Sequence, residues 1–151
     1  MKNKILVIAE AGVNHNGSLN NALKMVDLAA KAGADFIKFQ TFDPESLSNV
    51  DLGLAKYQEK HTKQKNHLKM LEKLALTAKS FKKISMRCKK KRIKFLSSPF
   101  DMKSINILKS LKISAFKIPS GQIDDIPYLE YIGSLKKKKF FYQQVCANCQ
   151  I

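Results

Sequence analysis

The chain of 151 residues is long enough for one domain with a hydrophobic core, and its 44% share of hydrophobic residues argues against wholesale disorder. Its formal net charge is +16, yet only Arg87 and Arg92 among the 28 basic residues are arginines. Recognition of nucleic acid favours the planar guanidinium, so this charge suits an anionic small molecule at least as well. A basic nucleic-acid-binding module stays open as an alternative.

Targeting and redox signals are weak in this sequence. The N-terminal apolar run, residues 5–9, is too short for a signal-peptide core or a membrane span, and no later run is longer. Three cysteines, at positions 88, 146 and 149, do not make a disulfide framework, which fits a reducing compartment. We therefore expect a cytoplasmic protein with no membrane partner.

The first half of the chain alternates between strand and helix patterns. Residues 4–12 form an apolar run ended by small residues, which predicts a buried strand of the parallel type. Ser18 is placed to cap a helix with apolar residues at helical spacing, and Gly33 is placed to end it. Residues 36–41 predict a second strand, whereas the polar stretch 43–65 shows no clear period and is expected to be a loop with some helix.

The second half repeats this alternation, with Asp101 as a candidate helix cap. Cys88 falls on an apolar helix face and is expected to lie in the core. Four rounds of strand, loop and helix predict parallel βα units in an α/β fold. The strands and helices of this half are expected over residues 68–75, 81–88, 94–99, 105–111, 115–121 and 126–135.

Polar side chains stand at the C-terminal ends of the predicted strands, where barrels and open α/β sheets place their chemistry. The sequence contains no G-x-G-x-x-G or Walker A loop, which argues against a dinucleotide or nucleoside triphosphate. The polar residues at these ends are Glu10, Lys38, Gln40, Ser97, Ser98, Lys117 and Ser120, and all of them except Ser98 are taken as candidate functional residues.

Four segments, one at each strand end, resemble a known family. They are IAEAGVNHNGSL (8–19), AGADFIKFQTF (32–42), KFLSSPFD (94–101) and FKIPSGQ (116–122). Over about residues 4–135 the chain resembles the N-terminal half of the sialic acid (N-acetylneuraminate) synthases. The resemblance implies a transferase that condenses phosphoenolpyruvate with an N-acylated sugar such as N-acetylmannosamine and releases phosphate. Synthesis of a related nonulosonic acid, such as legionaminic acid, is the alternative within the family.

The resemblance also implies roles for individual residues. Lys38, Lys117 and Ser120 match residues that bind phosphoenolpyruvate, and Gln40 and Ser97 are further substrate-binding candidates on the same rim. Glu10 matches the family's acid/base near the sugar.

Other features of the family bear on the same site. A divalent metal, manganese or magnesium, activates the sugar aldehyde, and its ligands come from later strands, so we assign no metal ligand in this chain. The full-length family is expected to form homodimers. Gln122 stands where the family commonly has glutamate. His15, in an asparagine-rich loop, is expected to be a hydrogen-bonding loop residue rather than a metal ligand.

The length of the chain bears on its organisation. A (β/α)8 TIM barrel takes about 250 residues, so four βα units are half of one. We expect residues 1–135 to be the N-terminal half of a barrel truncated after about four units, which on its own is inactive.

Residues 136–151 are expected to be an aberrant tail rather than a metal or redox site at the C-x-x-C of Cys146 and Cys149. The codons of this tail, read two bases later, permit (Phe/Leu)-Leu-Ser-Thr-Gly-Met, which resembles the family's next motif, so we expect a frameshift in the lysine run.

Overall fold

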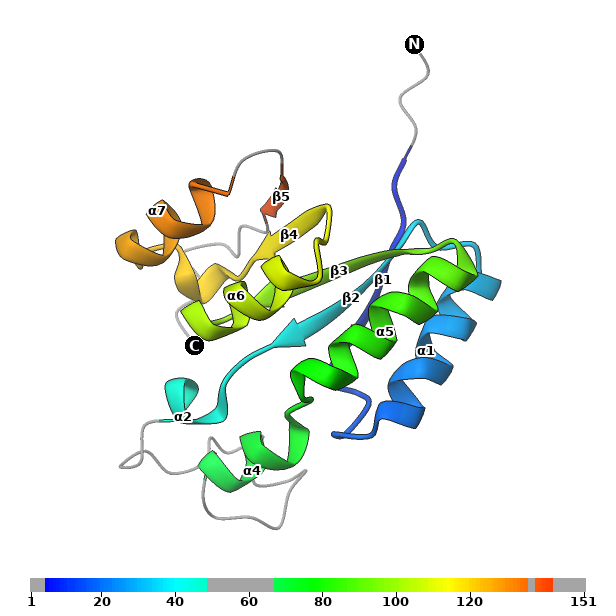
Figure 1. The fold of residues 1–151 in the computed structure, drawn as a ribbon, viewed down its shortest axis with the longest axis horizontal. Helices are drawn as coiled ribbons and strands as arrows, with labels where there is room; N and C mark the ends of the chain where they lie inside the picture. Colours follow the sequence, from blue (N-terminus) through cyan, green and yellow to red (C-terminus); the bar gives the residue numbers. More distant parts are fainter. Residues whose placement is uncertain (1–4, 49–66, 136–137, 143–151) are drawn as a thin grey trace, which may run out of the picture.

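A computed structural model gives the structure of residues 5–48, 67–135 and 138–142 (Figure 1). Strands and helices alternate along the chain, as the sequence pattern predicts. Their order is β1 (Ile8–Gly12), α1 (Leu19–Lys31), β2 (Phe36–Thr41), α2 (Pro44–Leu47), α4 (His67–Leu74), α5 (Ala78–Lys91), β3 (Lys94–Pro99), α6 (Met102–Ser110), β4 (Ala115–Ile118), the 3-10 turn η1 (Ser120–Gln122), α7 (Ile126–Gly133) and β5 (Lys139–Tyr142).

All strand pairs in the described chain are parallel. β1, β2 and β3 form one sheet in that order, and β4 pairs with β5 in a second. Figure 1 shows α1 and α5 side by side along one face of the first sheet, with α6 and α7 beside β4 and β5. This arrangement of parallel strands covered by helices confirms the α/β fold.

Local signals explain where the helices begin. Ser18 caps α1, because its Oγ accepts a hydrogen bond from the backbone N–H of Asn21. Asp101 caps α6 in the same way through Ser104. Both caps agree with the sequence prediction. Cys88 is buried on α5, as expected.

Both faces of β2, β3 and β4 are mostly buried, whereas β1 and β5 are partly exposed. Ile37, Phe39 and Phe116 lie in the main core with apolar residues of the helices. The alternate residues Phe36, Leu96 and Ala115 form a second, smaller cluster, against which Phe141 packs. This second cluster lies on the face of the strands that points away from the helices. Burial on both faces is the reason why the strands read as continuous apolar runs.

The structure differs from the sequence prediction at two places. The first strand begins at Ile8 rather than at residue 4, and Ile5 is 84% exposed. A fifth strand, β5, lies within the segment that the sequence argument set aside as a tail. Its aromatic residues supply the packing, since Phe140 stacks on Phe116 with ring centroids 6.1 Å apart, and Phe141 meets Phe36 edge-on at 5.4 Å.

Some predictions lie outside the described residues. They include the C-x-x-C of Cys146 and Cys149 and most of the polar stretch 43–65, of which α2 is described. The domain boundary at residue 135 and the frameshift remain predictions.

Within the described part of the chain, no helix combines the length and apolar character that crossing a membrane requires.

Candidate functional site

Strand register brings four of the polar side chains onto one surface. In the parallel ladders Glu10 lies beside Lys38, and Gln40 lies beside Ser98. Successive side chains of a strand point to opposite faces. Because Ile37 and Phe39 pack against the helices, Lys38 and Gln40 belong to the other face, which we call the inner face.

Lys117 belongs to the same inner face. Its neighbours in β4, Phe116 and Ile118, pack in the main core with the helices, so Lys117 faces away from them. Its pKa is lowered, first by burial and second by the like charge of Lys38, while Glu10 opposes the change. The three charged groups are therefore close enough to interact, although they come from three different strands.

Glu10 and Lys38 form an ion pair on the inner face of the sheet, between β1 and β2. The Lys38 Nζ lies 2.5 Å from Oε2 of Glu10. The Lys38 side chain is 11% exposed and that of Glu10 is 54% exposed. Burial of the ammonium strengthens its attraction for any anion that reaches it. With Lys117, the cluster holds two positive charges and one negative charge, which suits an anionic ligand.

The two serines of β3 have different roles. Ser97 is fully buried on the helix side, where its hydroxyl donates to the backbone carbonyl of Phe39 at 3.1 Å and accepts from Thr41 Oγ1 at 2.7 Å. These bonds tie β2 to β3. Ser98 shares the inner face with Gln40, and its buried Oγ has no hydrogen-bond partner among the described residues.

Ser98, and not Ser97, is therefore the serine that the structure brings to the inner face. Ser97 is the predicted candidate, but its hydroxyl already makes two hydrogen bonds within the sheet. Both serines follow the same apolar run, and a strand buried on both faces carries no alternation of apolar and polar residues that would separate them. The substrate-binding role of Ser97 stays a prediction that its hydrogen bonds do not favour.

The remaining candidates lie around this cluster. Ser120 is half-buried in η1, directly after β4, and Gln40 is half-buried at the end of β2. Gln122 donates from Nε2 to the backbone carbonyl of Phe100 at 3.0 Å and so connects the segment after β4 to the segment after β3. A glutamate at this position could not donate this hydrogen bond in its ionised form, whereas the amide can.

The loop after β1 packs closely and carries a buried histidine. His15 is 1% exposed, and its Nδ1 accepts a hydrogen bond from the backbone N–H of Gly17 at 3.1 Å. Burial lowers the pKa of His15, so it lies in the loop as a neutral ring. This geometry confirms a hydrogen-bonding loop residue, as the sequence analysis expected.

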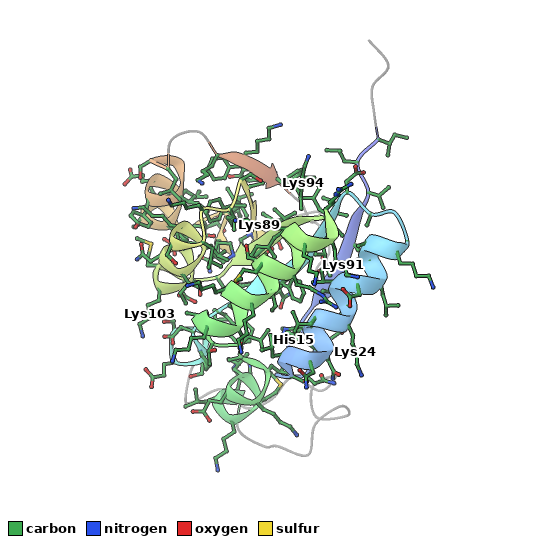
Figure 2. All side chains as sticks on the ribbon, turned by 45° about the vertical axis from the view of Figure 1, so that its right-hand side comes forward. His15, Lys24, Lys89, Lys91, Lys94 and Lys103 are labelled. Carbon is green, nitrogen blue, oxygen red and sulfur yellow. The ribbon has the colours of Figure 1, made fainter. Side chains whose placement is uncertain are left out.

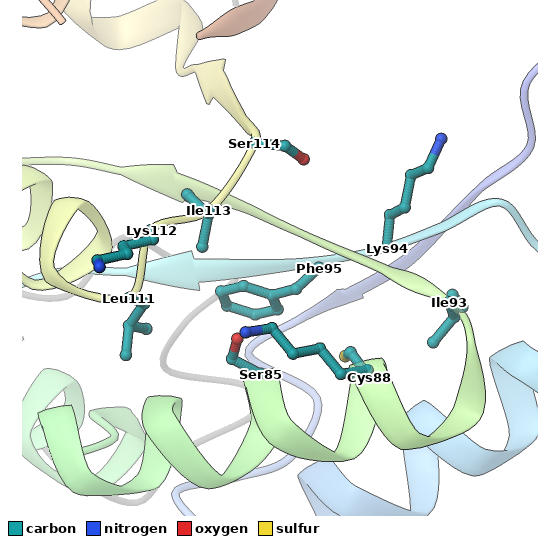
Figure 3. A pocket seen from close by; sticks show the side chains of 10 residues that line it. Ser85, Cys88, Ile93, Lys94, Phe95, Leu111, Lys112, Ile113 and Ser114 are labelled. Carbon is teal, nitrogen blue, oxygen red and sulfur yellow. The ribbon is translucent and has the colours of Figure 1, made fainter. Parts of the chain in front are cut away.

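A cavity of about 250 Å³ lies elsewhere, between α5, the start of β3 and the segment before β4 (Figure 3). Cys88, Lys94 and Ile113 are among its lining residues. Burial raises the pKa of the Cys88 thiol to about 12, which leaves it uncharged and a poor nucleophile. Figure 2 shows that Lys89 and Lys94 lie in this region, at the end where β3 begins. The cavity is therefore separate from the cluster of Glu10, Lys38 and Lys117.

A metal site requires several histidine, cysteine or acidic side chains close together. In residues 5–48, 67–135 and 138–142, no group of three histidine, cysteine or acidic side chains is placed to hold a metal ion. Glu10 is the carboxylate of the cluster, and it is already paired with Lys38. The described side chains form no such group by themselves, and the divalent metal stays an expectation, because the resemblance places its ligands on later strands.

Comparison with known proteins gives a consistent result. N,N'-diacetyllegionaminic acid synthase of Campylobacter jejuni is 47% identical over 136 residues, which are 89% of this chain and 41% of that protein. N-acetylneuraminate-9-phosphate synthase of Homo sapiens is 31% identical over 124 residues, or 82% of this chain and 34% of that protein.

A solved structure shows the same similarity in three dimensions. The N-acetylneuraminic acid synthetase of Leptospira borgpetersenii superposes with a TM-score of 0.71 at 35% identity, covering 86% of this chain and 41% of that one. The chain thus spans about two fifths of the length of these relatives. The sequence profile of the NeuB family matches residues 25–141. This chain belongs to the NeuB family.

Proposed function

We propose that this chain carries the phosphoenolpyruvate-binding wall of a nonulosonic acid synthase that works in the cytoplasm. The reaction joins C3 of phosphoenolpyruvate to the aldehyde carbon of an N-acylated sugar, adds water at C2 and releases phosphate. The observation that carries the proposal is the Glu10–Lys38 ion pair on the inner face of β1 and β2, with Lys117 on the inner face of β4. The relatives named above support it, since all are synthases of nonulosonic acids.

The charges of the cluster match those of phosphoenolpyruvate. This small enol carries both a phosphate and a carboxylate, and the two ammonium groups of Lys38 and Lys117 would balance them. Ser98 offers a buried hydroxyl without a partner, and Ser120 and Gln40 add donors at the rim. Glu10, the more exposed member of the ion pair, would face the sugar and exchange a proton with it.

Two sugars are candidates, and relatives of both kinds match this chain. Two N,N'-diacetyllegionaminic acid synthases, from Campylobacter jejuni and Legionella pneumophila, are 47% and 40% identical to this chain. The N-acetylneuraminate-9-phosphate synthase of Homo sapiens is 31% identical. We therefore propose a sugar with two acetamido groups, with N-acetylmannosamine as the second candidate.

Binding of phosphoenolpyruvate tests the proposal directly on the 151-residue chain. Isothermal titration calorimetry should detect binding to the wild type, and Lys38→Met or Lys117→Met should weaken it strongly but measurably. Each charge-assisted contact is worth about 1.5–3 kcal/mol, which corresponds to roughly a tenfold to hundredfold loss of affinity. Lys24→Met is the matched control, because Lys24 is an exposed lysine of α1 (Figure 2). A folded wild type that binds no phosphoenolpyruvate would contradict the proposal.

A chimera tests the reaction and the sugar. Residues 5–135 of this chain would replace the matching segment of the Leptospira borgpetersenii synthetase, which supplies the rest of its fold. We expect phosphoenolpyruvate-dependent release of phosphate. A shift of preference from N-acetylmannosamine to the diacetamido sugar would support the legionaminic acid assignment, and an unchanged preference would favour the second candidate.

A further inference from the structure

We propose that Glu10 competes with phosphoenolpyruvate for Lys38. In the unliganded chain the Glu10 carboxylate holds the ammonium of Lys38, and the arriving anion displaces it. The displaced carboxylate then becomes free for the sugar. This inference rests on the proposed function and adds a device that couples the two substrate positions.

The ion pair is asymmetric in a way that suits an exchange of partners. Lys38 is the buried member, held in the middle strand of the sheet between β1 and β3. Glu10 is the exposed member, on the outer strand β1. When an anion competes for the ammonium, the lysine is therefore the group that stays in place, and the carboxylate has solvent to move into.

The backbone beside Glu10 is irregular. The register of β1 against β2 shifts between Glu10 and Gly12. Gly12 has a φ of +51°, a conformation that favours glycine, and a Cβ added there would lie 3.4 Å from Oε1 of Glu10. The carboxylate thus lies over a position without a side chain, at the point where the register of β1 against β2 shifts.

The charges favour the exchange once an anion arrives. Lys117 is repelled by Lys38 and attracted by Glu10, as the causes of its pKa change show. A phosphate or carboxylate near both lysines is attracted by two positive charges and repelled by Glu10. Its binding therefore opposes the Glu10–Lys38 pair, and by linkage the pair opposes the binding.

Titration of the 151-residue chain with phosphoenolpyruvate tests this competition. Glu10→Gln removes the competing charge and should tighten binding by about threefold, the range expected for a partly exposed ion pair. Glu10→Asp keeps a carboxylate and should stay closer to the wild type. Glu130→Gln, at an exposed position of α7, is the control for loss of one negative charge and should leave the affinity unchanged.

The same Glu10→Gln change in a Lys38→Ala variant separates the effect of the ion pair from a general effect of charge on affinity. In Lys38→Ala the pair no longer exists, so Glu10→Gln should change the affinity less than it does with Lys38 present. Urea denaturation of every variant shows whether it is folded.

The possible results are distinct. Unchanged or weaker binding in Glu10→Gln overturns the competition but leaves the proposed function in place. An equal effect of Glu10→Gln in both backgrounds also overturns it. Absence of binding to the folded wild type overturns the proposed function together with this inference.

Discussion

Arg87 of α5 holds Asp27 of α1 through both arms of its guanidinium. Its Nε donates to Oδ1 of Asp27 at 2.8 Å and its Nη2 to Oδ2 at 2.5 Å. Lys91 adds a longer contact of 3.7 Å to the same carboxylate. This pair joins the two helices that cover β1–β3, and the fork geometry is one that lysine cannot reproduce.

The pair predicts how the stability of the protein depends on pH. Hydrogen bonding to Arg87 is the main reason why the pKa of Asp27 lies below its usual value of 3.8. A carboxyl with a depressed pKa in the folded state stabilises it above the unfolded pKa, and this contribution is lost as pH falls through the folded pKa. The urea midpoint of the wild type should therefore fall more steeply between about pH 5 and about pH 2 than that of Asp27→Asn. Equal slopes would show that the pair contributes nothing.

Two glycines with positive φ should respond differently to alanine. A Cβ at Gly17 would lie 2.2 Å from the backbone oxygen of Lys73, whereas one at Gly33 would meet nothing within 4 Å. Gly33→Ala should lower the free energy of unfolding only by the penalty for an alanine with positive φ, about 1–2 kcal/mol. Gly17→Ala should cost more by a further ~1–3 kcal/mol, because the loop after β1 must move away from α4. The free energies of urea unfolding decide this, and similar losses would mean that the loop moves at no cost.

The two serines of β3 form a matched pair for separating stability from binding. Ser97→Ala removes two hydrogen bonds inside the sheet and leaves Thr41 without its acceptor, so the free energy of unfolding should fall by about 1–3 kcal/mol. Its affinity for phosphoenolpyruvate should not change. Ser98→Ala should show the reverse, with near-normal stability and binding weakened by about tenfold, the value of one charge-assisted hydrogen bond. Loss of affinity in Ser97→Ala alone would restore the sequence-based assignment.

The affinity for phosphoenolpyruvate should decline as the pH becomes alkaline. The decline should begin at a lower pH than deprotonation of a lysine with an ordinary pKa would produce. Burial and the charge of Lys38 lower the pKa of Lys117 from 10.5, so its ammonium loses the proton at a lower pH. Binding weakens as pH rises through that lowered pKa. In Lys117→Arg the guanidinium stays charged, and the decline should move to higher pH. A decline at the same pH in both proteins would assign it to another group.

The outer edge of β1 should make the chain self-associate. In the described sheet β1 pairs with β2 on one side only, and Ile5 and Leu6 beside it are 84% and 47% exposed. Open strand edges with apolar residues favour pairing between molecules. Leu6→Lys should reduce the concentration-dependent mass measured by light scattering. Met86→Lys, at an exposed position on α5, is the control and should have little effect. Equal effects of both changes would point to net charge instead of the edge.

The sequence by itself determined the fold class and most of the elements, because their signals are local. Ser18 and Asp101 cap helices through bonds to residues three positions away, and the apolar runs mark the strands wherever they lie. Four motifs at strand ends also indicated the family, and placed Glu10, Lys38 and Lys117 among the candidates.

Only the tertiary structure decided which of these side chains meet. Parallel strands buried on both faces lose the alternation that would separate Ser97 from Ser98, so the choice depends on the register of β3 against β2. The Glu10–Lys38 ion pair likewise follows from the register of β1 and β2, which are separated by a helix in the chain. β5 is a strand because its aromatic side chains pack on two opposite faces. Phe140 contacts Phe116 of β4, and Phe141 contacts Phe36 of β2. Such contacts between distant segments leave no local signal in the sequence. They bring Glu10, Lys38 and Lys117, from three different strands, together in one charged cluster.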